Sequence, residues 1–238
     1  MPSVAEKLMF FARRAPELSR EEFQRTYLTE HARGPMEHFP RLTRYAVNVV
    51  DADWQPKVEH ALADTDVIAE MWFDELGDFL DRARRFDSSD TAVAMQTEAD
   101  EFFGGVVAYH VRQGIQRDYE RSWPDGERSP GVKMVYPVVR KEGITREQFA
   151  EHWLHKHVPL VLKYMNGISR YVTNVVVRRV GKAPEIDGIV ELTFFNPDEL
   201  KGPRYNAPEA EALMSDDVAE FLTPFGLAFR TSEYILRS

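Results

Sequence analysis

Two histidines, His31 and His157, are the residues of this chain best suited to acid–base chemistry. Imidazole has an ordinary pKa near neutrality, so it can take up and return a proton within one turnover. Each histidine ends a series of ring-bearing residues spaced by four: Phe23, Tyr27 and His31, then Phe149, Trp153 and His157. This spacing makes one inward-facing stripe on a helix, from which each histidine could reach a cavity between packed sheets, and we predict that both histidines are catalytic. The alternative is a structural histidine that binds backbone carbonyls at a helix end.

Each histidine is followed by the sequence Arg-Tyr-x-x-Asn. Residues three apart on a strand point to opposite faces of a sheet, so the tyrosine and the asparagine must separate. We expect the tyrosine to face helices or core, and the asparagine to face a cavity where its amide could hold a carbonyl or oxyanion. The alternative is an asparagine that binds a neighbouring loop. The predicted substrate-binding residues are Tyr27, Tyr45, Asn48, Trp153, Tyr171 and Asn174.

A third pattern, His152 and His155 one helical turn apart beside His157, has a spacing that a metal can use. No carboxylate completes a recognisable set of two histidines and one carboxylate, so we predict a solvated polar face and no metal. The chain has no cysteine, which excludes disulfides, thiolate nucleophiles and iron–sulfur clusters. Gly-x-Ser-x-Gly, P-loop and dinucleotide-binding glycine motifs are also missing from the sequence, and we predict no cofactor.

The composition narrows the class of protein further. The 238 residues include 30 Lys and Arg against 39 Asp and Glu, a formal net charge of -9. A nucleic-acid binder needs surplus basic residues to displace counterions from phosphates, so we predict no nucleic-acid partner. The N-terminal residues lack a basic region followed by an apolar run, and no window approaches the ~20 apolar residues of a membrane span. We therefore expect a cytoplasmic protein without a membrane partner.

An internal repeat organises these motifs. Residues 7–50 align without gaps on residues 133–176, and 12 of the 44 pairs are identical, including Lys7/Lys133, His31/His157 and Asn48/Asn174. Residues 66–73 align in turn with residues 187–194, including Glu70 with Glu191, and residues 95–103 align with residues 214–222. Between the copies, residues 113–131 are polar and rich in Pro and Gly, as linkers are. We predict domains at residues 1–113 and 132–238, joined by a linker at 114–131.

Each copy is predicted to have the same six elements. Ser19-Arg-Glu-Glu22 and Thr145-Arg-Glu-Gln148 fit the capping box, so a helix should start at each of these positions. Apolar and β-branched runs predict strands before and after the helix, and Pro137 predicts a bulge or an early end in the first strand of the second copy. A second helical region is expected at residues 77–85 and 206–211, extending to residues 103 and 222. The order is β-α-β-β-α-β, the ferredoxin-like unit.

In this unit the helices cover only one face of the sheet, so the other face must be shielded from water by another part of the protein. We therefore predict an α+β fold in which two tandem ferredoxin-like domains pack sheet to sheet as an internal barrel, with a cavity between the sheets. The tandem copy makes the chain a pseudo-dimer within itself, and further association into a homodimer is compatible with this arrangement.

With these motifs, the sequence resembles the EthD family of the dimeric α+β barrel superfold. The resemblance rests on Phe149-x-x-x-Trp153-x-x-x-His157-x-Pro159 and Arg170-Tyr171-x-x-Asn174, which the first copy repeats with Tyr27 for the Trp and Arg33 for the Pro. Family members usually pair as single-domain dimers, which implies a fused dimer here. The family is tied to alkyl ether catabolism and to decarboxylation or dehydration of aromatic polyketides. The superfold also includes cofactor-free monooxygenases, an isomerase and haem peroxidases.

The resemblance and the residues together imply a cofactor-independent enzyme, an oxidoreductase or a lyase, that acts on a small apolar or aromatic catabolite. We expect His157 to be the general acid/base, with His31 heading the equivalent site, Asn174 orienting the substrate, and Trp153 and Tyr171 shaping the pocket. One alternative is a non-catalytic binding protein for such a molecule. The other is a haem-binding barrel, although Pro184 replaces the first Gly of the Gly-x-x-Asp-Gly peroxidase signature.

Overall fold

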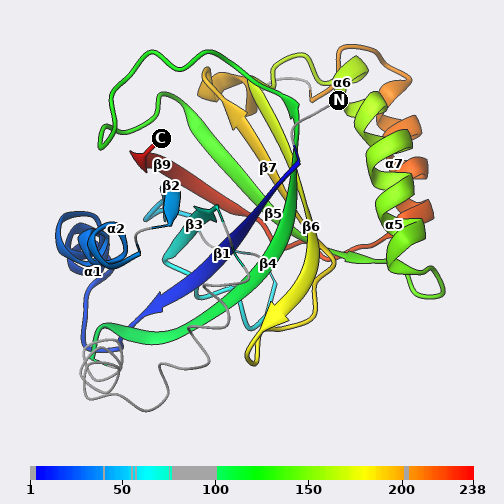
Figure 1. Cartoon of the computed structure of the whole chain (residues 1–238). Helices are drawn as coiled ribbons and strands as arrows, with labels where there is room; N and C mark the ends of the chain where they lie inside the picture. Colours follow the sequence, from blue (N-terminus) through cyan, green and yellow to red (C-terminus); the bar gives the residue numbers. More distant parts are fainter. Residues whose placement is uncertain are drawn as a thin grey trace.

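The computed structural model describes residues 4–39, 41–54, 56, 58–74, 76, 101–200 and 204–238. Its strands form one antiparallel sheet that closes into a barrel through the pairing of β5 with β7 (Figure 1). The barrel strands are β1 Val4–Arg14, β2 Leu42–Val50, β3 Val67–Phe73, β4 Phe103–Arg117, β5 Val132–Arg140, β6 Arg170–Val180, β7 Gly188–Phe194 and β9 Phe229–Arg237. The short β8, Leu222–Thr223, pairs with the end of β5. The predicted α+β class and the internal barrel are confirmed.

The two halves of the chain contribute equivalent sets of strands. The order is β4-β1-β3-β2 in the first half and β9-β5-β7-β6 in the second, and the halves join through β2–β9 and β4–β6. β4 continues to Arg117, four residues into the predicted linker. There the Arg117 guanidinium donates to the carbonyls of Leu162, Met165 and Ile168 in the second half. The first half therefore helps to terminate a helix of the second.

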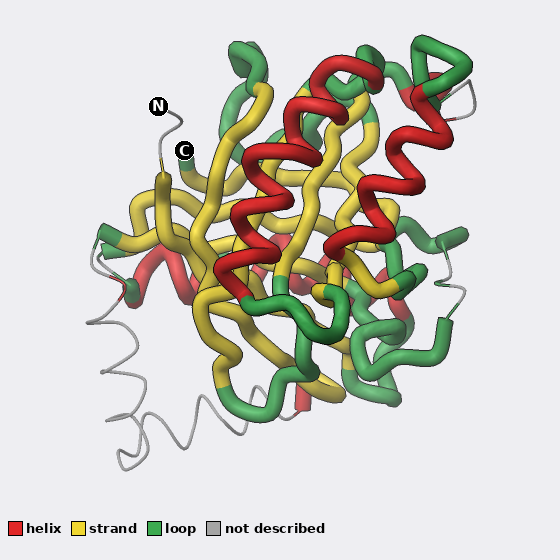
Figure 2. Tube along the Cα trace, turned by 90° about the vertical axis from the view of Figure 1, so that its right-hand side faces the viewer, coloured by secondary structure: helices red, strands yellow, loops and turns green. Residues whose placement is uncertain are grey.

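The helices pack on the outside of the barrel (Figure 2). The first half has α1 Arg20–Thr26, a π-helical turn η1 Tyr27–His31 and α2 Arg33–His38. The second half has α5 Arg146–His152, the π-helical turn η3 Trp153–His157, α6 Val158–Tyr164, the 3₁₀ turn η4 Pro197–Leu200 and α7 Ala210–Phe221. The predicted second helical region of the first half, residues 77–85, lies outside the described residues.

Both predicted helix starts are confirmed by their caps. The Ser19 hydroxyl accepts from the Glu22 amide, and Thr145 and Gln148 form a complete reciprocal capping box. The π turns follow seven residues later in each half, where the amides of Ala32 and Val158 bond to carbonyls five residues back. A π turn inserts one extra residue into a helix and occurs often at functional sites. The repeat thus places the same helical irregularity at both histidines.

Pro137 does not interrupt β5, contrary to the sequence-based expectation. It pairs in register with Ile189 of β7, and β5 continues to Arg140. On its other edge, β5 pairs with β9 through Val135 and with β8 only from Val139. Pro137 lies between these two ladders, where its missing N–H costs no strand–strand hydrogen bond.

Candidate functional site

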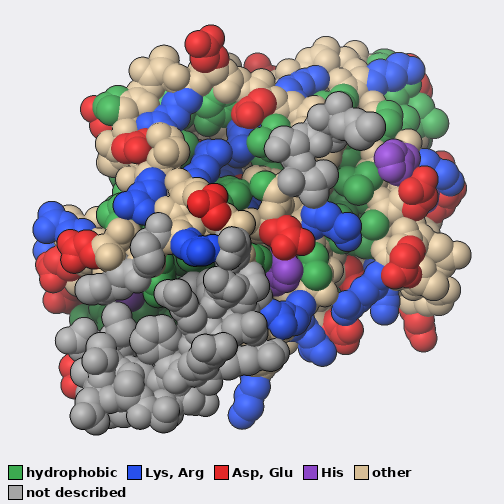
Figure 3. All heavy atoms as spheres, viewed as in Figure 1, with side chains coloured by type: hydrophobic (Ala, Val, Ile, Leu, Met, Phe, Trp, Pro, Cys, Tyr) green, Lys and Arg blue, Asp and Glu red, His purple; other side chains and the backbone are tan. Residues whose placement is uncertain are grey.

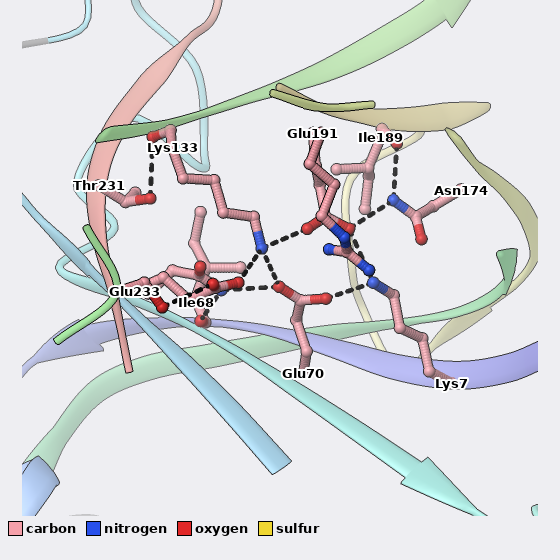
Figure 4. A network of polar contacts seen from close by, with 12 residues as sticks. Lys7, Ile68, Glu70, Lys133, Asn174, Ile189, Glu191, Thr231 and Glu233 are labelled. Atoms are coloured by element: carbon pink, nitrogen blue, oxygen red, sulfur yellow. Dashed lines mark hydrogen bonds and ion pairs between the residues drawn. The ribbon is translucent and has the colours of Figure 1, made fainter. Parts of the chain in front are cut away.

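The barrel interior contains a network of buried charges that links the two halves (Figure 4). Lys7 Nζ lies 2.7 Å from Glu191 Oε1, and Lys133 Nζ lies 2.6 Å from Glu70 Oε1 and 3.0 Å from Glu233 Oε1. Lys7 also pairs with Glu70, and Lys133 with Glu191. None of the five side chains is more than 5 % exposed. Each lysine thus binds a glutamate of its own half and one of the other half.

These contacts favour the ionised forms of Glu70, Glu233 and Lys133. Burial by itself would raise the pKa of Glu70, but the ammonium groups of Lys133 and Lys7 hold that pKa well below its ordinary value. Burial likewise opposes ionisation of Glu233, and Lys133 lowers its pKa below the ordinary value. The pKa of Lys133 is raised: burial would lower it, but Glu191, Glu233 and Glu70 outweigh that effect. Lys7 and Lys133 supply two positive charges for the three carboxylates, and Arg170, which also interacts electrostatically with Glu191 and Glu233, supplies the third.

Asn48 and Asn174 belong to this network. The Asn48 amide donates to the Ile68 carbonyl at 3.0 Å and to Glu70 at 2.8 Å. The Asn174 amide repeats this with the Ile189 carbonyl at 2.9 Å and Glu191 at 2.8 Å. Both asparagines face the barrel interior, as the spacing on the strand predicts. They hold glutamates there, and their predicted role toward a substrate stays a prediction.

The prediction that His31 and His157 reach a cavity between the sheets is wrong. The helices that carry His31 and His157 pack on the outer face of the barrel, whereas Asn48 and Asn174 are on its inner face. Beside the charged network, the interior is filled by apolar side chains that include Met9, Phe11, Tyr109, Val135 and Phe229. The candidate residues therefore form two groups separated by the sheet, because alternate strand residues face opposite sides.

His157 shares a carboxylate with His152 on the outer face of the second half. His157 Nδ1 lies 2.7 Å from Asp217 Oδ2, and His152 Nε2 lies 2.8 Å from Asp217 Oδ1. Asp217 comes from α7, so helix packing creates the cluster. The ring of His152 stacks on Phe221 with centroids 4.6 Å apart, and that of His157 lies 5.2 Å from it. The three polar side chains are 11 to 13 % exposed and remain accessible to solvent.

This geometry selects the protonation state of His157. Burial lowers its pKa below the ordinary value, although the hydrogen bond and the charge of Asp217 act to raise it. The ring is therefore neutral at pH 7, and the carboxylate requires the proton on Nδ1. Nε2 has no hydrogen-bond partner among the described residues and presents a lone pair. A carboxylate that orients a neutral imidazole in this way is the arrangement of a general base.

Trp153 and Tyr171 pack together beneath this cluster, between helix and sheet. The Trp153 indole N–H donates to the Tyr171 hydroxyl at 3.2 Å, and both side chains are 1 % exposed. The rim of the indole lies against Gly188 of β7, where an added Cβ would be 2.4 Å from Trp153 Cζ3. These two predicted pocket residues are therefore core residues that support the segment leading to His157.

The first half has a different arrangement at the equivalent positions. The Tyr27 and Tyr45 hydroxyls are 3.4 Å apart, and burial raises the pKa of Tyr27 to about 12. The ring centroid of His31 lies 4.9 Å from Tyr27 and 5.4 Å from Phe102. Burial lowers the pKa of His31, with no opposing carboxylate among the described residues. The alignment places Glu98 opposite Asp217, and Glu98 lies outside those residues.

Sequence reasoning missed the charged network and Asp217. The network had a signal, because Lys7/Lys133 and Glu70/Glu191 are identical pairs in the repeat. No identical pair pointed to Asp217, because the residue aligned with it in the first half is a glutamate. A cavity of ≈ 570 Å³ lies at the start of α7 and contains none of the predicted site residues; it is lined by Arg204, Tyr205, Asn206, Ala207, Pro208 and Glu211.

Two further findings concern the described residues only. They contain no group of three or more metal-binding side chains arranged to hold an ion. They also form no helix with the length and apolar character needed to cross a bilayer. On the face shown in Figure 3, basic and acidic side chains are interspersed and do not form one continuous basic surface.

Comparison with known proteins assigns the family. The model of the EthD domain matches the chain twice, at residues 15–103 and 141–224. The chain belongs to the EthD family. Both matches include a candidate histidine, so the tandem EthD architecture predicted from the repeat is confirmed. No curated protein sequence matches this EthD chain.

Solved structures share the fold of this EthD protein at low sequence identity. An anthrone oxidase-like protein matches with a TM-score of 0.61 and 11% identity, covering 99% of this chain and 94% of its own. A putative monooxygenase from Fusobacterium nucleatum matches with a TM-score of 0.56 and 12% identity, covering 100% and 94%. A putative chlorite dismutase matches with a TM-score of 0.50 and 9% identity, covering 97% and 95%. At these identities the similarity concerns the fold.

Proposed function

We propose that this EthD protein is an enzyme in which His157 Nε2 takes a proton from a small apolar or aromatic substrate. The observation that carries the proposal is the 2.7 Å contact between His157 Nδ1 and Asp217 Oδ2. It fixes the tautomer, leaves Nε2 free to accept, and stabilises the imidazolium that forms when the proton is taken. Phe221 supplies an apolar wall beside the ring.

The reaction class follows from what the site contains. A histidine base beside aromatic side chains suits removal of a proton from a carbon or a phenolic oxygen of an apolar molecule. The carbanion so formed leads to dehydration, isomerisation or reaction with dioxygen, whereas a phenolate supplies electron density that assists the loss of carbon dioxide from the same ring. The names of two proteins with this fold, one anthrone oxidase-like and one a putative monooxygenase, favour reaction with dioxygen.

We further propose that residues 1–113 and 132–238 are two ferredoxin-like units, so that the chain replaces the homodimer of single-domain relatives. The matching strand orders of the halves support this. The Lys7–Glu191 and Lys133–Glu70 pairs across the halves also support it, since the exchange of equivalent contacts is typical of a two-fold interface.

A haem-binding function has one observation in its favour. A histidine whose Nδ1–H is held by a carboxylate also suits an axial ligand, because this bond orients the ring and raises its basicity. The surroundings do not fit a macrocycle, however. Phe149, Trp153 and Phe221 are each 1 % exposed and in ring contact through Phe149, so they fill the layer between helix and sheet.

The proposal is tested by turnover. Mass spectrometry of molecules that co-purify with the full chain identifies the substrate class, and an anthrone with oxygen consumption as the readout is the first defined substrate to try. His157→Ala should lower kcat/KM by about 10²- to 10⁴-fold, the usual contribution of a general base. His155→Gln is the matched control, because the His155 side chain is 67% exposed and its ion-pair partner is Glu151 and not Asp217. Unchanged turnover in a His31→Ala, His157→Ala double variant would show that neither histidine is the base.

A further inference from the structure

Arg44 and Arg170 occupy equivalent positions of the repeat but have different partners. Arg170 Nε donates to Asp118 Oδ1 at 2.9 Å, and its side chain is 7% exposed. Arg44 Nε is buried as well, yet it has no hydrogen-bond partner, and Arg44 forms no ion pair within the described residues. A buried guanidinium N–H without an acceptor is costly. The Arg170–Asp118 pair therefore shows what this position binds, and the described residues of the first half supply no equivalent acceptor.

A second buried donor, Gln113 Nε2, belongs to a side chain that is bonded to the indole of Trp72, and Arg44 contacts the same indole. Arg44 Cζ is 4.8 Å from the ring centroid of Trp72, whose Nε1 donates to Gln113 Oε1 at 2.9 Å. This bond fixes the orientation of the Gln113 amide, and Gln113 Nε2, in a residue 3% exposed, has no acceptor among the described residues. Buried polar atoms are nearly always paired, so two unmet donors around one ring indicate a missing acceptor.

The surroundings define the chemistry of that acceptor. Planar guanidinium groups match carboxylates, as the Arg170–Asp118 pair shows in the equivalent place. Trp72 also packs in an apolar cluster with Ala46, Ile235 and Ala5, which suits an organic body more than a hydrated inorganic ion. Part of the Arg44 side chain is exposed, whereas its Nε and Gln113 Nε2 are buried.

We propose that Arg44, Trp72 and Gln113 bind the carboxylate of a small organic acid at the first-half end of the barrel. Arg44 Nε–H and Gln113 Nε2–H donate to the carboxylate, and the apolar cluster contacts the rest of the molecule. The strand registers Lys7↔Val111 and Lys133↔Thr231 make Glu233 the equivalent of Gln113, so the second half has a negative charge where the first has a donor. The site belongs to one half only, and it does not depend on the proposed role of His157.

Isothermal titration of the full chain with sodium benzoate, in a buffer low in chloride, tests this site. We expect one benzoate per chain and no measurable binding of benzamide, its neutral analogue. Arg44→Gln should weaken benzoate binding about tenfold or more, the usual effect of losing a charge-assisted hydrogen bond. Gln113→Glu, which copies the second half, should weaken it at least as much. Arg178→Gln, at an exposed position of β6, should leave the affinity unchanged.

Several outcomes would overturn the proposal. Wild-type protein that binds no benzoate at millimolar concentration would mean that water satisfies both donors. Equal binding of benzamide, or of inorganic phosphate, would show that no organic carboxylate is selected. An unchanged affinity in Arg44→Gln would place any binding elsewhere. Circular dichroism of each variant confirms its fold, and the Gln113→Glu result stands independently if Arg44→Gln is unfolded.

Discussion

The inner and outer faces of the barrel have diverged to different extents between the two halves. On the inner face, Lys7, Glu70 and Asn48 repeat as Lys133, Glu191 and Asn174 with nearly identical contacts. On the outer face, the repeated histidines lie in different surroundings. Inner residues must complement the other half as well as their own, so a change there leaves a buried charge unpaired. The outer-face residues that contact His157, namely Asp217 and Phe221, belong to the same half and can change independently of the other half.

Two pairs of packed residues on the outer face show how one half can change independently and still remain well packed. In the second half, Trp153 fits because β7 has Gly188 beneath it. In the first half the aligned residues are Tyr27 and Val67, a smaller ring over a larger strand residue, and both are buried. Volume lost on one side is regained on the other, as close packing requires.

The largest effect should come from breaking the inner network. Lys133→Met leaves three buried carboxylates short of a cation, and we expect the free energy of unfolding to fall by about 3–5 kcal/mol, as when a buried ion pair loses one partner. Lys7→Met should cost less, because Lys7 contacts two carboxylates. Urea denaturation measures both, with exposed Lys182→Met as the control. Equal, small losses would mean that the network does not join the halves.

The contact between Trp153 and Gly188 on the outer face should give the next largest effect on the free energy of unfolding. Gly188→Ala places a methyl group against the Trp153 ring, and we expect a loss of about 1–3 kcal/mol from overpacking. Adding Trp153→Tyr, the ring of the first half, should recover part of that loss. Gly34→Ala, where no atom lies within 4 Å of the added carbon, is the matched control. Additive losses in the double variant would contradict the compensation.

Acid should weaken the inner face in a defined direction. The pKa values of Glu70 and Glu233 are lowered in the folded protein, so their stabilisation is complete above the ordinary glutamate pKa of about 4.3. It is lost as the pH falls through the lower, folded-state pKa. In Lys133→Met these pKa values rise, and acid unfolding monitored by circular dichroism should begin at a higher pH. An unchanged acid midpoint would argue against ionised glutamates.

The smallest effect concerns the histidine pair. The charge of His152 contributes to lowering the pKa of His157, so His152→Gln should move the pKa of His157 upward. An NMR titration of the imidazole C–H signals measures the shift. A downward shift would mean that His152 acts on His157 mainly through its hold on Asp217.

The fold was predictable to the extent that its signals are local. The capping sequences at Ser19 and Thr145 locate both helices, and the repeat gives two equivalent halves. The partners of Lys7 were not predictable, since Glu70 and Glu191 are 63 and 184 residues away and meet it only through strand register. The predicted location of His157 was wrong for a related reason. Helical periodicity indicates which face of a helix is buried, but it does not indicate whether that face packs against the inside or the outside of a barrel.

The central claim is that Asp217 holds the proton of His157 on Nδ1 and leaves Nε2 as a free base. Long-range proton–nitrogen NMR correlation of the imidazole at pH 7, assigned with a His157→Gln variant, tests it without a substrate. We predict a protonated Nδ1 and an unprotonated Nε2, and Asp217→Asn should abolish this preference. A proton on Nε2, or on both nitrogens, in the wild-type protein at this pH would contradict the claim.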